Sequence, residues 1–180
     1  MLRELVANRE LRAVSGTAFA VTPALREAYA SGDDDELAEV AMGEAARASL
    51  RLLAAERQEP AESADYDPAD GADAEPTATH SHSHSPVYRR AVIAADVLGA
   101  KLRSDLDDAV VRLTGPIGYD QIASVHVDLA EAEPQVAKAV DVVDAADLGD
   151  TDAEFVLGDA EDHQLAWYAA QELPFLLELL

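Results

Sequence analysis

The sequence predicts an α/β protein in which helices pack on a small mixed or mainly parallel sheet, with a mixed α+β fold as the alternative. Apolar residues make up 49 % of its 180 residues, which suffices for a hydrophobic core. Short apolar runs alternate with longer segments of helical periodicity, a pattern typical of strands joined by helices. One long polar stretch interrupts this pattern at residues 57–86 and divides the predicted single domain into two halves.

The first half, residues 1–56, is predicted to hold helices and one short strand. Residues 1–10 place their apolar side chains on one helical face, and residues 17–21 form an apolar, strand-like run. Thr22 and Pro23 then give a helix N-cap followed by proline in the first helical position. We therefore expect a short helix that ends near residue 30.

A long helix is predicted to follow, from the three aspartates at residues 33–35 to about Glu56. Carboxylates favour a helix N-terminus because they meet the positive end of the helix dipole. Apolar residues recur at three- and four-residue steps, which indicates a face that packs inward. That face consists of Leu37, Ala41, Ala45, Ala48 and Leu52.

Residues 57–86 are predicted to form a disordered insertion. The stretch is rich in Pro, Ala, Asp, Glu, Ser and His and shows no apolar periodicity, so it cannot bury enough surface to offset its ordering entropy. His80, His82 and His84 alternate with other polar residues inside it. Such imidazoles bind transition metals adventitiously, and a polar linker is the simpler interpretation because a flexible segment lacks the residues that would orient the ligands.

The second half, residues 87–180, is predicted to alternate strands and helices. Apolar runs predict strands at residues 87–97, 109–113 and 123–128. A helix opened by Pro134 should follow, and residues 150–155 should form a loop or a single helical turn. The predicted inward face of that helix is Val136, Val140 and Val143.

Residues 161–177 show helical spacing, although Pro174 must break or restart the helix. The spacing is carried by Leu165, Tyr168, Ala169 and Leu173. Trp167, the single tryptophan, is interpreted as a core anchor together with Phe19, Tyr29 and Tyr168. The apolar run at residues 175–180 either docks on the core or offers a dimer surface, with docking favoured.

Composition restricts the classes of partner and site. The net charge is −23, from 36 acidic residues against 13 Lys and Arg, which disfavours nucleic acids and anionic membranes and favours a basic partner. The chain has no cysteine, so disulfides and thiol chemistry are excluded. No secretory leader and no apolar run of about 20 residues is found, so a cytoplasmic location is expected. No Gly-rich phosphate loop or G-x-S-x-G motif is present, and no cofactor is predicted.

His126 and Asp128 are the strongest candidates for a chemical site. They lie two apart on a predicted strand and so point to one face of the sheet. Together with Asp162 and His163 they could bind a divalent metal, or His126, Asp128 and His163 could act in acid–base catalysis. The same residues also fit a structural interpretation, in which Asp128 caps the next turn and Glu161 or Asp162 caps the next helix.

Several segments resemble a family of functionally uncharacterised proteins from high-GC actinobacteria. The resemblance is carried by residues 17–29, 46–54, 92–97, 125–128 and 161–174, and it extends over nearly the whole chain outside the insertion. It implies no activity. It also implies a strand before the first helix, which this sequence lacks, so we expect an unpaired edge or a gap in the sheet.

Two functions remain open at this point. The first is a non-enzymatic interaction or accessory domain with a protein partner or a second copy of itself, because no complete catalytic constellation is found and the chain is acidic with an apolar end. The alternative is a small hydrolase-like enzyme assisted by a divalent metal bound by the His/Asp cluster. The two differ in whether His126, Asp128 and His163 converge on one point.

Overall fold

Capping residues set where the early helices begin. In the computed structural model, which describes residues 2–58 and 87–179, the Thr22 hydroxyl accepts a hydrogen bond from the Leu25 N–H at 3.1 Å. Helix α2 (Pro23–Ala28) therefore starts at Pro23, as predicted. The Asp33 carboxylate accepts from two backbone N–H groups in the same way, and α3 (Asp34–Gln58) begins directly after it. Both helices confirm the sequence analysis.

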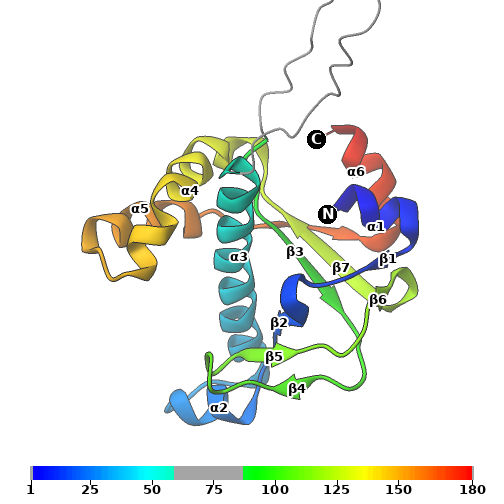
Figure 1. The fold of residues 1–180 in the computed structure, drawn as a ribbon, viewed down its shortest axis with the longest axis horizontal. Coiled ribbons are helices and arrows are strands. Elements are labelled where there is room, and N and C mark those ends of the chain that lie inside the picture. Colours follow the sequence, from blue (N-terminus) through cyan, green and yellow to red (C-terminus); the bar gives the residue numbers. More distant parts are fainter. Residues whose placement is uncertain (1, 59–86, 180) are drawn as a thin grey trace, which may run out of the picture.

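The remaining elements follow the predicted order in most places (Figure 1). The predicted strands near residues 17, 91, 110 and 123 are confirmed as β2, β3, β5 and β7. The bounds are α1 Leu2–Asn8, β1 Glu10–Leu11, β2 Thr17–Phe19, β3 Ala91–Ala95, β4 Lys101–Leu102, β5 Val110–Arg112, β6 Ile117–Gly118, β7 Ile122–Val127, α4 Glu133–Asp147, α5 Thr151–Glu161, β8 Ala166–Ala169 and α6 Leu173–Leu179, with 3-10 turns at Val14–Gly16, Tyr119–Gln121, Ala130–Ala132 and Ala170–Glu172.

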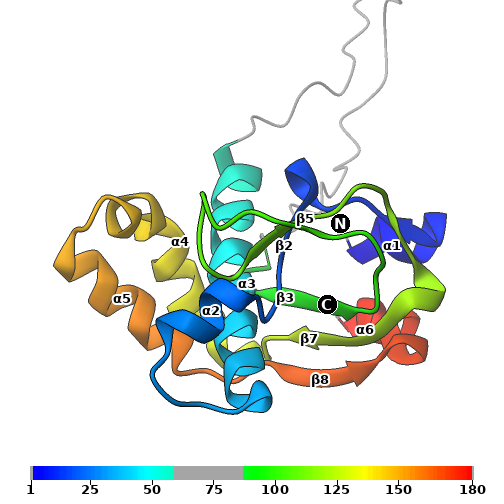
Figure 2. The same cartoon turned by 90° about the horizontal axis from the view of Figure 1, so that it is seen from below.

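The strands form three small sheets, so the chain has the mixed α+β fold. The orders are β1-β6, β2-β5-β4 and β3-β7-β8. Every strand pair in the described part of the chain is antiparallel, and the expectation of a mixed or mainly parallel sheet is therefore wrong. Figure 2 shows the two three-stranded sheets on the same side of α3, with α4 and α5 on its other side.

The antiparallel pairing of β7 and β8 follows from the two helices between them. A single crossover helix brings the chain back parallel to the first strand, whereas two antiparallel helices reverse it once more. The sequence predicts only a loop or a single helical turn at residues 150–155. Instead, the Asp150 carboxylate accepts hydrogen bonds from the N–H groups of Asp152 and Ala153 and caps a full helix, α5.

The helical prediction for residues 161–177 is wrong over Ala166–Ala169, which form strand β8. The segment pairs with β7, placing Trp167 opposite His126 and Tyr168 opposite Val125. Tyr168 packs on the core, but Trp167 is 61 % exposed and is no core anchor. The apolar residues of this segment are spaced as in a helix, but hydrogen bonding to β7 makes residues 166–169 a strand.

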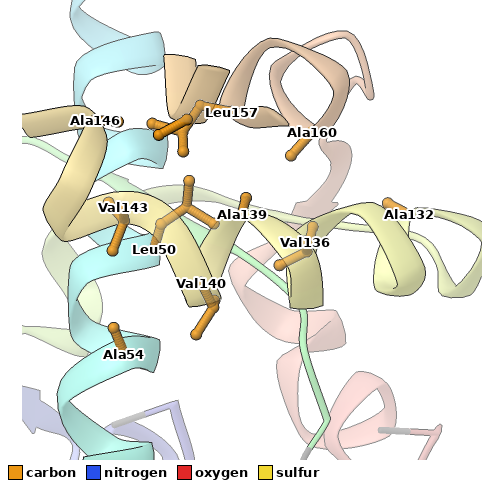
Figure 3. Close-up of a cluster of buried hydrophobic side chains, with 11 residues drawn as sticks. Leu50, Ala54, Ala132, Val136, Ala139, Val140, Val143, Ala146, Leu157 and Ala160 are labelled. Carbon is orange, nitrogen blue, oxygen red and sulfur yellow. The ribbon is translucent and has the colours of Figure 1, made fainter. Parts of the chain in front are cut away.

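The largest apolar cluster lies where α3, α4 and α5 meet (Figure 3). Val136, Val140 and Val143 of α4 are buried, as predicted. On α3 the fully buried contact is Leu50, which points toward α4 and α5. Ala45, Ala48 and Leu52, expected on the inward face, are only half-buried. The reason is that α3 packs against α4 and α5 through a different face, which carries Leu50 and Ala54.

A second cluster covers one face of the sheet β3-β7-β8. Leu5 of α1 and Leu173 of α6 pack there against Val125 of β7. Of the other predicted aromatic anchors, Phe19 packs against a small cluster beside α2, and Tyr29 is exposed. None of the helices in the described ranges combines the length and apolar character that a membrane span requires.

The chain end docks on the core, as favoured, and the dimer surface stays a prediction. Leu176 of α6 is buried in the second cluster, so the helix docks on the core, whereas Phe175 and Leu179 are exposed one turn apart. The predicted disordered insertion lies outside the described residues over 59–86, together with its three histidines. Its expected first two residues, Arg57 and Gln58, belong instead to the last turn of α3.

The substitution Leu50→Ala should destabilise the protein strongly. Leu50 is fully buried between three helices, so the truncation removes apolar contacts and leaves a cavity. We expect a loss of about 2–5 kcal/mol in the free energy of unfolding, measured by urea denaturation. Leu148→Ala is the matched control, because Leu148 is 90 % exposed, and it should change stability by less than about 0.5 kcal/mol. Equal effects would contradict the assigned core.

Candidate functional site

Asp128, a predicted site residue, is bound to a buried arginine. Its two carboxylate oxygens accept hydrogen bonds from Nε and Nη2 of Arg90, each at 2.8 Å, and one also accepts from the Arg90 N–H. Arg90 is 2 % exposed, and its Nη2 donates a further bond to the His163 carbonyl oxygen at 2.7 Å. Asp128 therefore joins β3, β7 and the turn before β8, and its oxygens are committed to Arg90.

His126 and His163 line one groove, together with Arg47 and Glu161. The groove holds about 730 Å³ between α3 and the turn before β8. The His126 ring Nε2 lies 3.0 Å from the Ser124 hydroxyl, two residues back on the same strand face. Burial lowers the pKa of the His126 imidazole below its usual value, which favours the neutral ring at pH 7.

The other metal candidates do not complete a ligand set around these histidines. Asp162 is exposed at the C-terminal end of α5. Asp96 joins β3 to the turn before β7 through its backbone, which bonds with Gln121. Within residues 2–58 and 87–179, no three His, Asp or Glu side chains form a group able to hold a metal ion. A metal in this groove stays a prediction of the sequence alone.

A larger groove lies beside the first one, between α3 and the two three-stranded sheets, and Ala38, Met42 and Glu44 line both grooves. Its volume is about 1000 Å³, at the upper end of the range for small-molecule sites. The wall from α3 includes the small residues Ala41, Ala45 and Ala48 beside the larger Met42 and Leu52, and β2 and β3 line the groove along their whole lengths. We call it the inter-sheet groove. The predicted inward face of α3 is only half-buried because Ala45, Ala48 and Leu52 border this groove.

The charged lining of the inter-sheet groove is predominantly acidic. Glu44, Asp96 and Asp107 line it together with one basic residue, Arg51. Arg51 is already bound to Asp147 through Nε and Nη2, at 2.6 and 2.7 Å. Burial, and after it the negative charge of Asp107, raises the pKa of the Glu44 carboxyl. An apolar groove with a destabilised carboxylate favours a ligand that is apolar and positively charged.

Both strands beside the inter-sheet groove are edge strands. Within the described residues, β2 pairs only with β5, and β3 pairs only with β7. Each edge turns toward the groove some backbone groups that its own sheet does not use.

The sequence analysis missed Arg90 and the inter-sheet groove. Arg90 sits next to Arg89 in an otherwise apolar run, and nothing in that run distinguishes the buried arginine from the one that pairs with Glu133 at the surface. The groove did leave a signal in the sequence. Positions 38, 41, 45 and 48 are all alanine, and side chains this small leave space beside the helix unless a neighbour fills it.

The chain belongs to a family of unknown function (DUF6912), whose model matches residues 1–177. No curated protein and no solved structure matches the chain. The family match confirms the predicted resemblance to an uncharacterised family, and it assigns no activity to any residue.

Removing either partner of the buried ion pair should destabilise the protein. Asp128→Asn or Arg90→Met each leaves a buried group without its partner, with an expected loss of about 3–5 kcal/mol in urea unfolding. The double variant Arg90→Met/Asp128→Leu should recover much of that loss, because no unpaired charge remains. Arg103→Met is the control, since its partner Asp105 is exposed and surface pairs contribute little. Single variants as stable as this control would show that the pair organises nothing.

Proposed function

We propose that the protein is a non-enzymatic interaction domain of the cytoplasm, which binds an apolar, positively charged segment of a partner protein in the inter-sheet groove. The observation that carries the proposal is the groove itself, with about 1000 Å³ of volume, apolar walls and acidic residues on its lining. A site of this kind needs no reacting group, because burial of apolar surface and charge complementarity are sufficient for binding.

Apolar burial supplies affinity in this proposal. The alanines of α3 leave room for side chains that a larger residue would exclude, and Val92 and Val111 add branched apolar surface from the two sheets. Each buried methylene of a bound side chain contributes about 0.8 kcal/mol. A few aliphatic side chains of the partner therefore give measurable affinity.

Charge supplies selectivity. The net charge of −23 attracts basic segments and repels nucleic acids and acidic proteins, including a second copy of this chain. At the groove, burial and after it the negative charge of Asp107 raise the pKa of the Glu44 carboxyl, and a bound cation would offset both effects. Binding should accordingly weaken with added salt.

Ala48→Trp should abolish binding of a partner segment. The probe is a blocked, fluorescein-labelled heptapeptide of alternating lysine and valine, whose valines share one face when it is extended. We expect saturable binding to the wild-type protein by fluorescence anisotropy, and at least a tenfold loss with Ala48→Trp, because the indole fills the groove.

The matched control is Ala55→Trp, at an exposed position on the same helix that does not line the inter-sheet groove. It should bind like wild type, and circular dichroism should show both variants folded. Equal affinities of the two variants, or no saturable binding to the wild type, would contradict the proposed function.

A metal-assisted, hydrolase-like enzyme is the second candidate, and it is supported by His126 and His163 lining one groove. Its weakness is Asp128, which would have to leave Arg90 to reach a metal. Titration of metal-stripped protein with Zn²⁺, followed by imidazole NMR signals, separates the two functions. We expect no one-to-one saturation at His126 and His163, because structural and catalytic zinc sites need at least three protein ligands. Such saturation would favour the enzyme.

A further inference from the structure

We infer that the partner segment binds as a β-strand inserted between β2 and β3, which joins the two three-stranded sheets across the inter-sheet groove. This inference rests on the proposed function and adds the conformation and hydrogen bonding of the bound segment. It is carried by the pattern of backbone hydrogen bonds on the two strands, which is independent of the apolar lining.

The pattern on β3 is set by its pairing with β7. The Asp128 N–H donates to the Arg90 carbonyl, so these opposite residues form a hydrogen-bonded pair. In an antiparallel ladder such pairs alternate, so residues 92 and 94 also face β7, whereas Ala91 and Ile93 face away from it. The register shifts between Ala94 and Ala95, but the Asp96 N–H donates to the Gln121 carbonyl beyond the shift, so Ala95 also faces away from β7. The Ala91 N–H confirms the alternation, because it donates to the Ser49 hydroxyl of α3 at 3.1 Å.

The pattern on β2 is set by its pairing with β5. The Ala20 N–H donates to the Ala109 carbonyl, and the Leu113 N–H donates to the Gly16 carbonyl. By the same alternation residue 18 faces β5, whereas Thr17 and Phe19 direct their backbone groups away from it. The Thr17 N–H already donates to the Val14 carbonyl, so this edge offers the Thr17 C=O and both backbone groups of Phe19. Both outward-facing edges, Thr17–Phe19 and Ile93–Ala95, line the inter-sheet groove.

An extended polypeptide satisfies both edges at once. Alternate residues of a strand present their N–H and C=O groups to opposite sides, so one set pairs with β2 and the other with β3. Its side chains project to the two faces of the new sheet, and one face meets the alanines of α3. A compact organic ligand would fill the volume but leave these backbone groups unpaired.

The chemistry of the occupant follows from the lining. Residues facing α3 should be aliphatic, because Ala41, Ala45 and Ala48 form that wall. At least one basic residue should lie near Glu44 and Asp107. The bound stretch excludes proline, which has no N–H to donate. A second copy of this acidic chain does not meet these requirements, so the occupant is a strand of a different, basic protein.

N-methylation of alternate residues in the lysine–valine heptapeptide tests the inserted strand. Methyl groups on one set of amides block pairing with one of the two edges, and methyl groups on the other set block the second edge. We expect each set to weaken anisotropy-measured binding at least tenfold, because each blocked edge loses more than one hydrogen bond. If the unmodified peptide binds and a methylated set binds equally well, the strand inference fails and the proposed function stands. If the unmodified peptide does not bind, both fail.

Amide hydrogen exchange provides the second measurement. On addition of the unmodified peptide, the N–H groups of Phe19, Ile93 and Ala95 should become protected at least tenfold, whereas Ala18 and Val92 should change little because they already face β5 and β7. Strong protection of the amides of Phe19, Ile93 and Ala95 in the free protein would overturn the inference, since it would show that both edges are already paired.

Discussion

The buried ion pair between Arg90 and Asp128 fixes the arrangement of the central sheet. It holds β3 against β7 at one end of their ladder, and through the His163 carbonyl it also holds the turn that leads into β8. A buried arginine is tolerated only when its N–H donors are hydrogen-bonded. The Arg90 guanidinium donates two hydrogen bonds to the Asp128 carboxylate and one to the His163 carbonyl. The positions of His126 and of the groove beside it depend on this pair, because the strand and the turn meet there.

Local signals in the sequence predicted local structure well and strand direction poorly. Thr22 and Asp33 begin helices because their side chains bond to nearby N–H groups, a contact that needs no tertiary partner. Asp150 does the same for α5. The alternation of strands and helices predicts a mixed or mainly parallel sheet, but α5 adds a second helix between β7 and β8, and these strands are antiparallel. Strand β8 was mistaken for helix because its short run fits both periodicities, and only pairing with β7 distinguishes them.

The candidate sites were less predictable, because they are assembled from distant segments. The shared strand face of His126 and Asp128 follows from their spacing, but the partner of Asp128 lies 38 residues away and looks like any surface arginine in the sequence. The inter-sheet groove combines residues from both halves of the chain. Its one visible sign was the alanine-rich face of α3, which a periodicity argument assigns to the core, because alanine is apolar whether or not a neighbour covers it.

Two edge strands facing one apolar groove are a liability, since such edges promote pairing between identical chains. The charge of this protein opposes that outcome. With 36 acidic residues against 13 Lys and Arg, copies of the chain repel one another before their edges can meet, and Glu44 and Asp107 place the same sign of charge in the groove itself. The same field attracts a basic strand. Acidity thus acts as protection against self-association and as selection for a partner, and both effects weaken together as salt screens the charges.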